Sequence, residues 1–185
     1  MDGSCQPGRV ADVVSGGAEP ASRRSRALLV TAVLLAVVAF GADRWWADRE
    51  RARLGAAVLA GEQTVTGSRT SLAGLAAYSA GLLYSADVPA GARRSAYGNL
   101  GDDARRWAPR VDAAREAVAG TDVLPWHTGT REARAAYDLR LQAWADVLRR
   151  FAADPQSGVG DDPAVTQARI AARDALRAAG LDLLD

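Results

Sequence analysis

Few residues of this chain could support catalysis. His127 is the only histidine and Cys5 the only cysteine, so no zinc-ligand set can be assembled around His127. The serines and threonines show no recognisable arrangement with His127 of the kind that activates a nucleophile. All 23 basic residues are arginine, and the absence of lysine excludes a Walker-type phosphate loop and Schiff-base chemistry.

Adjacent carboxylates occur at two places, Asp102 with Asp103 and Asp161 with Asp162. Each pair stands where a helical pattern starts, and an acidic residue there accepts hydrogen bonds from free backbone N–H groups and complements the helix dipole. Capping therefore explains both pairs without calcium or catalysis. The Glu-x-x-His motif of di-iron bundle sites is also absent. We predict that the chain is not an enzyme and holds no metal or cofactor.

Trp126 and His127 are the candidate residues for contact with a partner. They follow Pro125 in a loop between two helical patterns. A tryptophan in such a loop either folds back over the end of the helices or stays exposed as a contact for another protein, and we favour the covering role. For His127 we expect ordinary contact with solvent.

Gly67, Gly74 and Gly81 recur at seven-residue spacing on one helical pattern. A glycine inside a helix costs about 1 kcal/mol relative to alanine, so three glycines at one helical position suggest that another helix approaches closely. That helix would belong to a partner protein or to a second copy of this chain. Because the chain contains 18 glycines, coincidence is the alternative.

Helices must position all of these residues, because no segment shows the period-two alternation of a strand. Apolar residues recur at alternating spacings of three and four, with short connections between the patterns. The predicted helices cover residues 47–87, 89–119, 130–154 and 163–180. We therefore predict an all-α fold in which these helices form an antiparallel four-helix bundle. Trp107, Tyr137 and Trp144 are expected to carry much of its core energy.

The first of these helices has a seam of apolar and small residues spaced by three and four. The seam consists of Leu54, Val58, Gly61, Val65, Ser68, Leu72, Leu75, Ser79 and Leu82. Its middle, residues 61–71, is rich in Gly, Ser and Thr. The helix therefore either continues or breaks near Gly67 and restarts around Thr70, and we favour a continuous helix. On the third helix, Arg134 and Asp138 are expected to form an ion pair at four-residue spacing.

An uncharged run of sixteen residues, Ala27–Ala42, is the strongest signal for location. As a helix it covers about 24 Å, slightly less than the ~30 Å hydrocarbon core of a bilayer, and amphipathic flanking side chains extend it. We predict a transmembrane signal anchor over residues 23–46 in the cell membrane. Arginines before the run favour a cytoplasmic N-terminus and an extracytoplasmic domain over 47–185. The expected membrane-interface residues are Arg23, Arg24, Arg26, Trp45 and Trp46.

Two other interpretations of this run stay open. It is also compatible with a secretory signal cleaved after small residues such as Ala39 and Gly41, which would release a secreted helical protein, or with a buried helix of a soluble protein. Residues 1–22 have few apolar side chains and are expected to form a disordered cytoplasmic tail. The alternating charges of residues 48–53 are expected to be solvated.

Function is weakly specified by the sequence. From Arg44 onward, 19 arginines face 18 acidic residues, so no basic surplus indicates nucleic-acid binding. Alanine and glycine are abundant and lysine is absent, a composition typical of a GC-rich bacterial genome. One anchor followed by an external helical bundle resembles, in architecture only, the ligand-sensing domains of bacterial chemoreceptors and sensor kinases. Those receptors return through the membrane, whereas Ala27–Ala42 is the only span expected here.

We therefore expect a non-catalytic binding or assembly module of the cell envelope, whose partner is another envelope protein or a second copy of the chain. The alternative is a domain that binds a small ligand, unidentified by the sequence, and signals through a separate partner. A cavity near Trp107, Tyr137 and Trp144 would favour this alternative.

Overall fold

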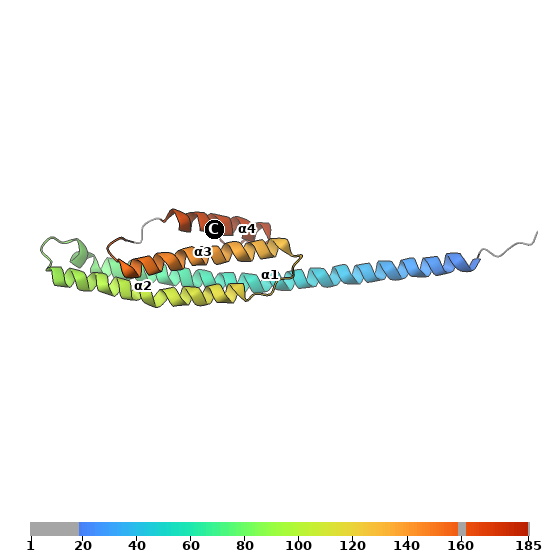
Figure 1. Ribbon diagram of the computed structural model, residues 1–185, viewed down its shortest axis with the longest axis horizontal. Coiled ribbons are helices and arrows are strands. Elements are labelled where there is room, and N and C mark those ends of the chain that lie inside the picture. The colour runs from blue at the N-terminus through green and yellow to red at the C-terminus, as the bar shows by residue number, and fades with distance from the viewer. Residues whose placement is uncertain (1–18, 159–161, 185) are drawn as a thin grey trace, which may run out of the picture. The chain divides into compact units, whose positions relative to one another are not determined.

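The computed structural model describes residues 19–158 and 162–184, with side chains from Arg26 onward (Figure 1). Over these residues the chain forms four α-helices and no strand, which confirms the all-helical prediction. The helices are α1 (Glu19–Tyr84), α2 (Ala90–Ala119), α3 (Thr128–Ala153) and α4 (Pro163–Ala178). The chain divides into a first unit, Met1–Arg44, and a second unit, Trp45–Asp185.

The first unit contains the N-terminal part of α1. Because α1 begins at Glu19, the prediction of a disordered tail was wrong for residues 19–22; residues 1–18, with Cys5, lie outside the described part. Among the described helices, α1 alone is long and apolar enough to cross a membrane, with a mean hydropathy of 1.9 in its apolar window. The large apolar side chains of residues 28–40 are between 53% and 72% exposed. They contribute nothing to the core of the chain.

In the second unit, α1 supplies one wall of the core. The helix is continuous through residues 61–71, as favoured from the sequence. The seam is buried from Leu54 to Leu72, but Leu82 at its end is 41% exposed and its neighbour Leu83 is buried instead. A straight α-helix has 3.6 residues per turn, so a strict seven-residue repeat drifts around its surface. This drift moves the buried position by one residue at the end of α1.

The helix α3 is central to the second unit, because it contacts both α2 and α4 and hydrogen-bonds to α1. Within this unit successive helices run in opposite directions (Figure 1). The buried face of α3 includes Ala133, Tyr137, Leu141, Trp144, Leu148 and Phe151. Of the three aromatic residues expected in the core, Tyr137 and Trp144 are buried, and Trp107 on α2 is partly buried against the core.

Local signals determine both ends of α4. The Asp162 side chain accepts a hydrogen bond from the backbone N–H two residues later at 2.8 Å, and Pro163 occupies the first turn. Asp161, the other carboxylate of that pair, lies outside the described residues. At the other end the helix stops at Ala178, shortly before Gly180. Gly180 has φ of +80°, a left-handed conformation that favours glycine after a helix.

The two residues of the expected ion pair within α3 bind elsewhere, one to α2 and the other to the loop that follows α2. Asp138 binds Arg115 of α2 at 3.1 Å, whereas Arg134 donates to the Thr121 carbonyl oxygen at 2.7 Å. The prediction of an Arg134–Asp138 pair was therefore wrong. The pattern of one helix does not reveal which charges a neighbouring helix brings within reach.

Candidate functional site

A buried polar cluster joins α1 to α3. The Tyr137 hydroxyl oxygen lies 2.9 Å from the carbonyl oxygen of Val58 and 2.8 Å from Glu62 Oε1. Arg140 Nη2 donates to Glu62 Oε2 at 2.5 Å. Burial, followed by the negative charge of Glu62, raises the pKa of Tyr137 far above its ordinary value. Tyr137 therefore keeps its proton and serves as a hydrogen-bond donor rather than as a phenolate nucleophile or base.

Gly61 provides the space that Tyr137 occupies. A Cβ atom at position 61 would lie 2.5 Å from the Tyr137 hydroxyl oxygen and 3.1 Å from the nearest ring carbon. Since Tyr137 is 0% exposed and hydrogen-bonded, its ring cannot move aside easily. Gly61 is thus required by a close approach of α3, whereas the sequence pattern identified it only as one residue of the seam.

The carboxylates Asp102 and Asp103 do not start a helix. They lie inside α2, which begins at Ala90, so the capping prediction was wrong for this pair. Asp103 is buried and accepts hydrogen bonds from Ser71 of α1 at 2.7 Å and from Arg106 at 2.9 Å. Asp102 is exposed and pairs with an arginine one turn later. The core contacts of the first turns of α2 stabilise the helix upstream of the local capping signal.

His127 is mostly buried, contrary to the expected contact with solvent. Its side chain is 11% exposed, and its Nδ1 lies 2.6 Å from Oε2 of Glu50 on α1. The other oxygen of Glu50 accepts a hydrogen bond from the backbone N–H of Leu124 at 2.9 Å. Glu50 is therefore buried, and the expectation that it is solvated was wrong. Trp126 is 64% exposed and meets the His127 ring edge-on at 6.1 Å, so it covers little of the core.

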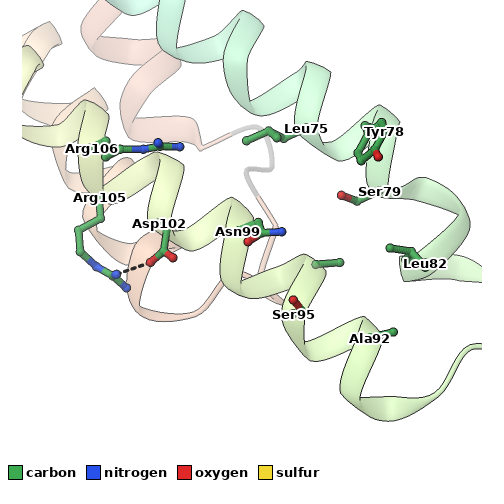
Figure 2. A pocket seen from close by; sticks show the side chains of 11 residues that line it. Leu75, Tyr78, Ser79, Leu82, Ala92, Ser95, Asn99, Asp102, Arg105 and Arg106 are labelled. Atoms are coloured by element: carbon green, nitrogen blue, oxygen red, sulfur yellow. Dashed lines mark hydrogen bonds and ion pairs between the residues drawn. The ribbon is translucent and has the colours of Figure 1, made fainter.

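A groove of about 760 Å³ lies between the C-terminal part of α1 and the N-terminal part of α2 (Figure 2). The α1 wall carries Tyr78, which is 88% exposed, and Leu82. The α2 wall carries the polar side chains of Ser95 and Asn99, and Arg105 lies at one end in an ion pair (Figure 2). The α1 wall is mainly apolar, with Ser79 as its polar residue, and the α2 wall is more polar, although two alanines also line it. Such a groove suits an amphipathic segment of a protein.

The three glycines spaced by seven residues have different surroundings. A Cβ atom at Gly67 would lie 3.0 Å from the Trp107 ring, so α2 of the same chain makes the close approach there. At Gly74 and Gly81 no atom of the described residues lies within 4 Å of that position. Gly74, Tyr78 and Gly81 are spaced by four and three residues and therefore share one face of α1. This face has room for the backbone of another molecule.

A second cavity, of about 430 Å³, lies where α1, α2 and α3 meet. Its most buried wall residues are Leu72, Leu100, Trp144 and Phe151. Arg69 is the one charged residue that lines it, and its guanidinium lies over the Trp144 ring at 4.6 Å from the centroid. The cavity is therefore apolar with a single positive charge. Of the three aromatic residues named for the ligand-binding alternative, Trp144 lines this cavity, whereas Trp107 and Tyr137 do not.

The expected membrane-interface residues are exposed where their side chains are described. Arg26 is exposed, and Trp45 and Trp46 are 55% and 43% exposed, with their rings packed edge to face at 5.2 Å. Arg23 and Arg24 lie within α1, but their side chains are outside the described part of the chain. Exposure at these positions is compatible with contact with lipid headgroups.

Sequence reasoning missed three charged residues that pair in the interior: Glu50 and Arg140 are buried, and Glu62 is partly buried. Glu50 lies four residues before Leu54 and so extends the buried seam of α1. Arg140 lies three residues after Tyr137 on the buried face of α3, and Glu62 adjoins Gly61. A charged residue at a seam position was therefore the available signal, because such a position requires a buried partner.

Comparisons of this chain with protein-family models, with curated proteins and with solved structures found no match. In the described part of the chain no three His, Cys, Asp or Glu side chains gather as a metal site would require. The candidate sites are therefore the groove between α1 and α2 and the cavity between α1, α2 and α3. The hydrogen bonds around Tyr137 join α1 to α3, and those around His127 join α1 to the loop between α2 and α3.

Proposed function

We propose that this chain is a single-pass membrane protein of a bacterial cell envelope, with its N-terminus in the cytoplasm. Its helical second unit binds a partner protein outside the cytoplasm and carries out no catalysis. The observation that carries this proposal is the open groove between α1 and α2, with the exposed Tyr78 on its rim. Exposed aromatic side chains at the edge of a groove are common anchors of protein interfaces.

The shape of the groove favours a protein over a small molecule. Small-molecule sites enclose most of their ligand, whereas Tyr78 on the rim of this groove is 88% exposed. The open backbone at Gly74 and Gly81 lets a helix or strand of the partner come close. The mainly apolar wall on α1 and the more polar wall on α2 would select an amphipathic segment.

The membrane anchor in this proposal is the apolar part of α1. Its large side chains are exposed, so the core formed by the described residues does not account for them. A bilayer would cover these side chains, and the arginines before Ala27 favour a cytoplasmic N-terminus. Reporter fusions at the two ends test the orientation: a cytoplasmic signal from the C-terminal fusion contradicts the proposal.

The groove contact is tested by placing a photo-crosslinking phenylalanine derivative at Tyr78 in the full chain in cells. We expect one discrete adduct, identified by mass spectrometry. The same substitution at Leu139, which is 59% exposed on α3, is the control and should give no such adduct. An adduct between two copies of this chain would identify the partner as a second copy.

A second variant tests whether the groove itself makes the contact. Ser95→Arg places a long charged side chain on the α2 wall and should abolish the Tyr78 adduct while helix content stays unchanged. Equal adducts from positions 78 and 139, or an adduct that survives Ser95→Arg, would show that the groove is not the binding surface.

A further inference from the structure

The cavity where α1, α2 and α3 meet shares no lining residue with the groove proposed for protein binding. Its volume of about 430 Å³ is in the usual range of small-molecule sites. Leu72, Leu100 and Phe151, which form its inner wall, are each no more than 6% exposed. They offer contact only to apolar groups, so a ligand must present hydrocarbon to this wall.

The rim of the cavity adds one positive charge. Arg69 is its only charged lining residue, and none of the described carboxylates forms an ion pair with it. Its guanidinium stacks on the Trp144 ring, and that ring is fixed because its Nε1 donates to Ser68 Oγ at 2.9 Å. The cation is therefore held at the edge of an apolar space. A guanidinium in this setting binds a carboxylate through two parallel hydrogen bonds.

Neighbouring charges strengthen the preference for an anion. Burial lowers the pKa of Arg140 and Glu62 raises it, while the positive charges of Arg169 and Arg69 lower it further. These arginines repel one another, and a carboxylate on Arg69 would reduce that repulsion. In addition, Arg140 Nη1 is a buried donor without a hydrogen-bond partner among the described residues, although Nη2 of the same side chain pairs with Glu62.

We propose that this cavity binds a single-chain apolar carboxylate, such as a free fatty acid of medium length. The hydrocarbon chain lies against Leu72, Leu100 and Phe151, and the carboxylate pairs with Arg69 at the rim. This ligand site goes beyond the protein contact proposed above and does not depend on it. It would allow the second unit to detect a small amphiphile.

The test is calorimetric titration of hexanoate, octanoate and octanol into the full chain in phosphatidylcholine nanodiscs, with empty discs subtracted. Each added methylene should tighten binding about three- to fourfold, since about 0.8 kcal/mol is gained for each buried CH₂. Octanol has the chain but no charge and should bind at least tenfold more weakly than octanoate. Equal affinities for octanol and octanoate would overturn the proposal.

Matched variants locate the site. Arg69→Gln should weaken octanoate about tenfold and leave octanol unchanged. Arg110 stacks on Trp107 at the same 4.6 Å but lies outside the cavity, so Arg110→Gln should have no effect. Ala76→Phe, which adds bulk to the lining, should weaken both ligands. The proposal is wrong if Arg69→Gln leaves octanoate affinity unchanged or if Arg110→Gln lowers it equally.

A further titration distinguishes a free fatty acid from a bilayer lipid, since both combine a negative charge with hydrocarbon. Part of the phosphatidylcholine in the discs is replaced by the anionic lipid phosphatidylglycerol. Unchanged octanoate affinity supports a free carboxylate as the ligand. Displacement of octanoate by phosphatidylglycerol would overturn that assignment, because the lipid would then occupy the site.

Discussion

At the scale of single residues, the Tyr137 hydroxyl has one proton and two acceptor oxygens within reach, from Val58 and Glu62. Glu62 is shared with Arg140, so each group of this cluster depends on the others. A buried polar group left without its partner costs about 1–3 kcal/mol. The α1–α3 interface therefore tolerates few substitutions at these positions, although none of them performs chemistry.

Replacing Gly61 with alanine tests the close packing under the Tyr137 ring. A helical glycine-to-alanine change normally stabilises by up to about 1 kcal/mol, and Gly74→Ala, with open space around it, should do so. Gly61→Ala should instead destabilise by about 1–3 kcal/mol, because the added methyl group overlaps the ring. Chemical unfolding of the full chain in detergent, followed by circular dichroism, measures both. Equal stabilisation by the two substitutions would contradict the packing.

The raised pKa of Tyr137 predicts a loss of stability at alkaline pH. The unfolded residue loses its proton around its ordinary pKa of 10.0, whereas the folded residue keeps it to higher pH. The contribution is therefore fully present below pH 10, and above it the free energy of unfolding falls by about 1.4 kcal/mol per pH unit. Tyr137→Phe lacks this contribution. The stability difference between the native chain and this variant should shrink between pH 9 and 11; a constant difference would argue against a buried neutral Tyr137.

At the scale of helices and loops, the connection between α2 and α3 is fixed by contacts with a residue of α1. Glu50 of α1 accepts the backbone N–H of Leu124 and contacts His127 at the start of α3. One carboxylate thus fixes the loop and the first turn of α3 to α1. The partners are 74 and 77 residues apart in the sequence, so this contact forms only when the helices have packed.

Removal of the Glu50 carboxylate should release this loop. Glu50→Ala leaves the Leu124 N–H without an acceptor and is expected to cost about 1–3 kcal/mol. Hydrogen exchange at Leu124 should become faster than in the native chain. Asp48→Ala is the control, since Asp48 is exposed and pairs only with Arg51 on its own helix. Similar exchange rates in both variants would show that Glu50 does not hold the loop.

At the scale of the whole molecule, the two units use apolar side chains in opposite ways. The second unit buries its own in a common core. The first unit exposes its large apolar side chains along α1, where none of the described residues covers them. A chain in water could not leave so much apolar surface uncovered without associating with something.

Charge in the apolar part of α1 should remove the chain from membranes. Each arginine at the centre of a spanning helix costs about 2.5–3.5 kcal/mol, so Leu34→Arg with Val37→Arg should shift the chain to the soluble or degraded fraction after cell fractionation. Leu59→Arg with Leu139→Arg is the control, because both side chains are exposed in the second unit. A double variant at 34 and 37 that still resists alkaline extraction would contradict the anchor.

The helices and the core could be predicted from the sequence because both depend on local periodicity. The buried face of α3 around Tyr137 and Trp144 follows directly from spacings of three and four. Contacts between helices could not be predicted in this way. Asp103 resembled a helix cap, yet it lies inside α2 and binds Ser71 of α1. His127 had no visible partner because Glu50 is far away in the sequence.

The recess that Gly61 forms for Tyr137 also limits how the bundle can move. Sliding α3 along α1 by one residue, about 1.5 Å, would carry the aromatic ring off the glycine and toward the buried side chain of Val58 or Val65 on the same face of α1. It would also break the bond between Trp144 and Ser68. Both contacts therefore oppose a piston-like displacement between these two helices.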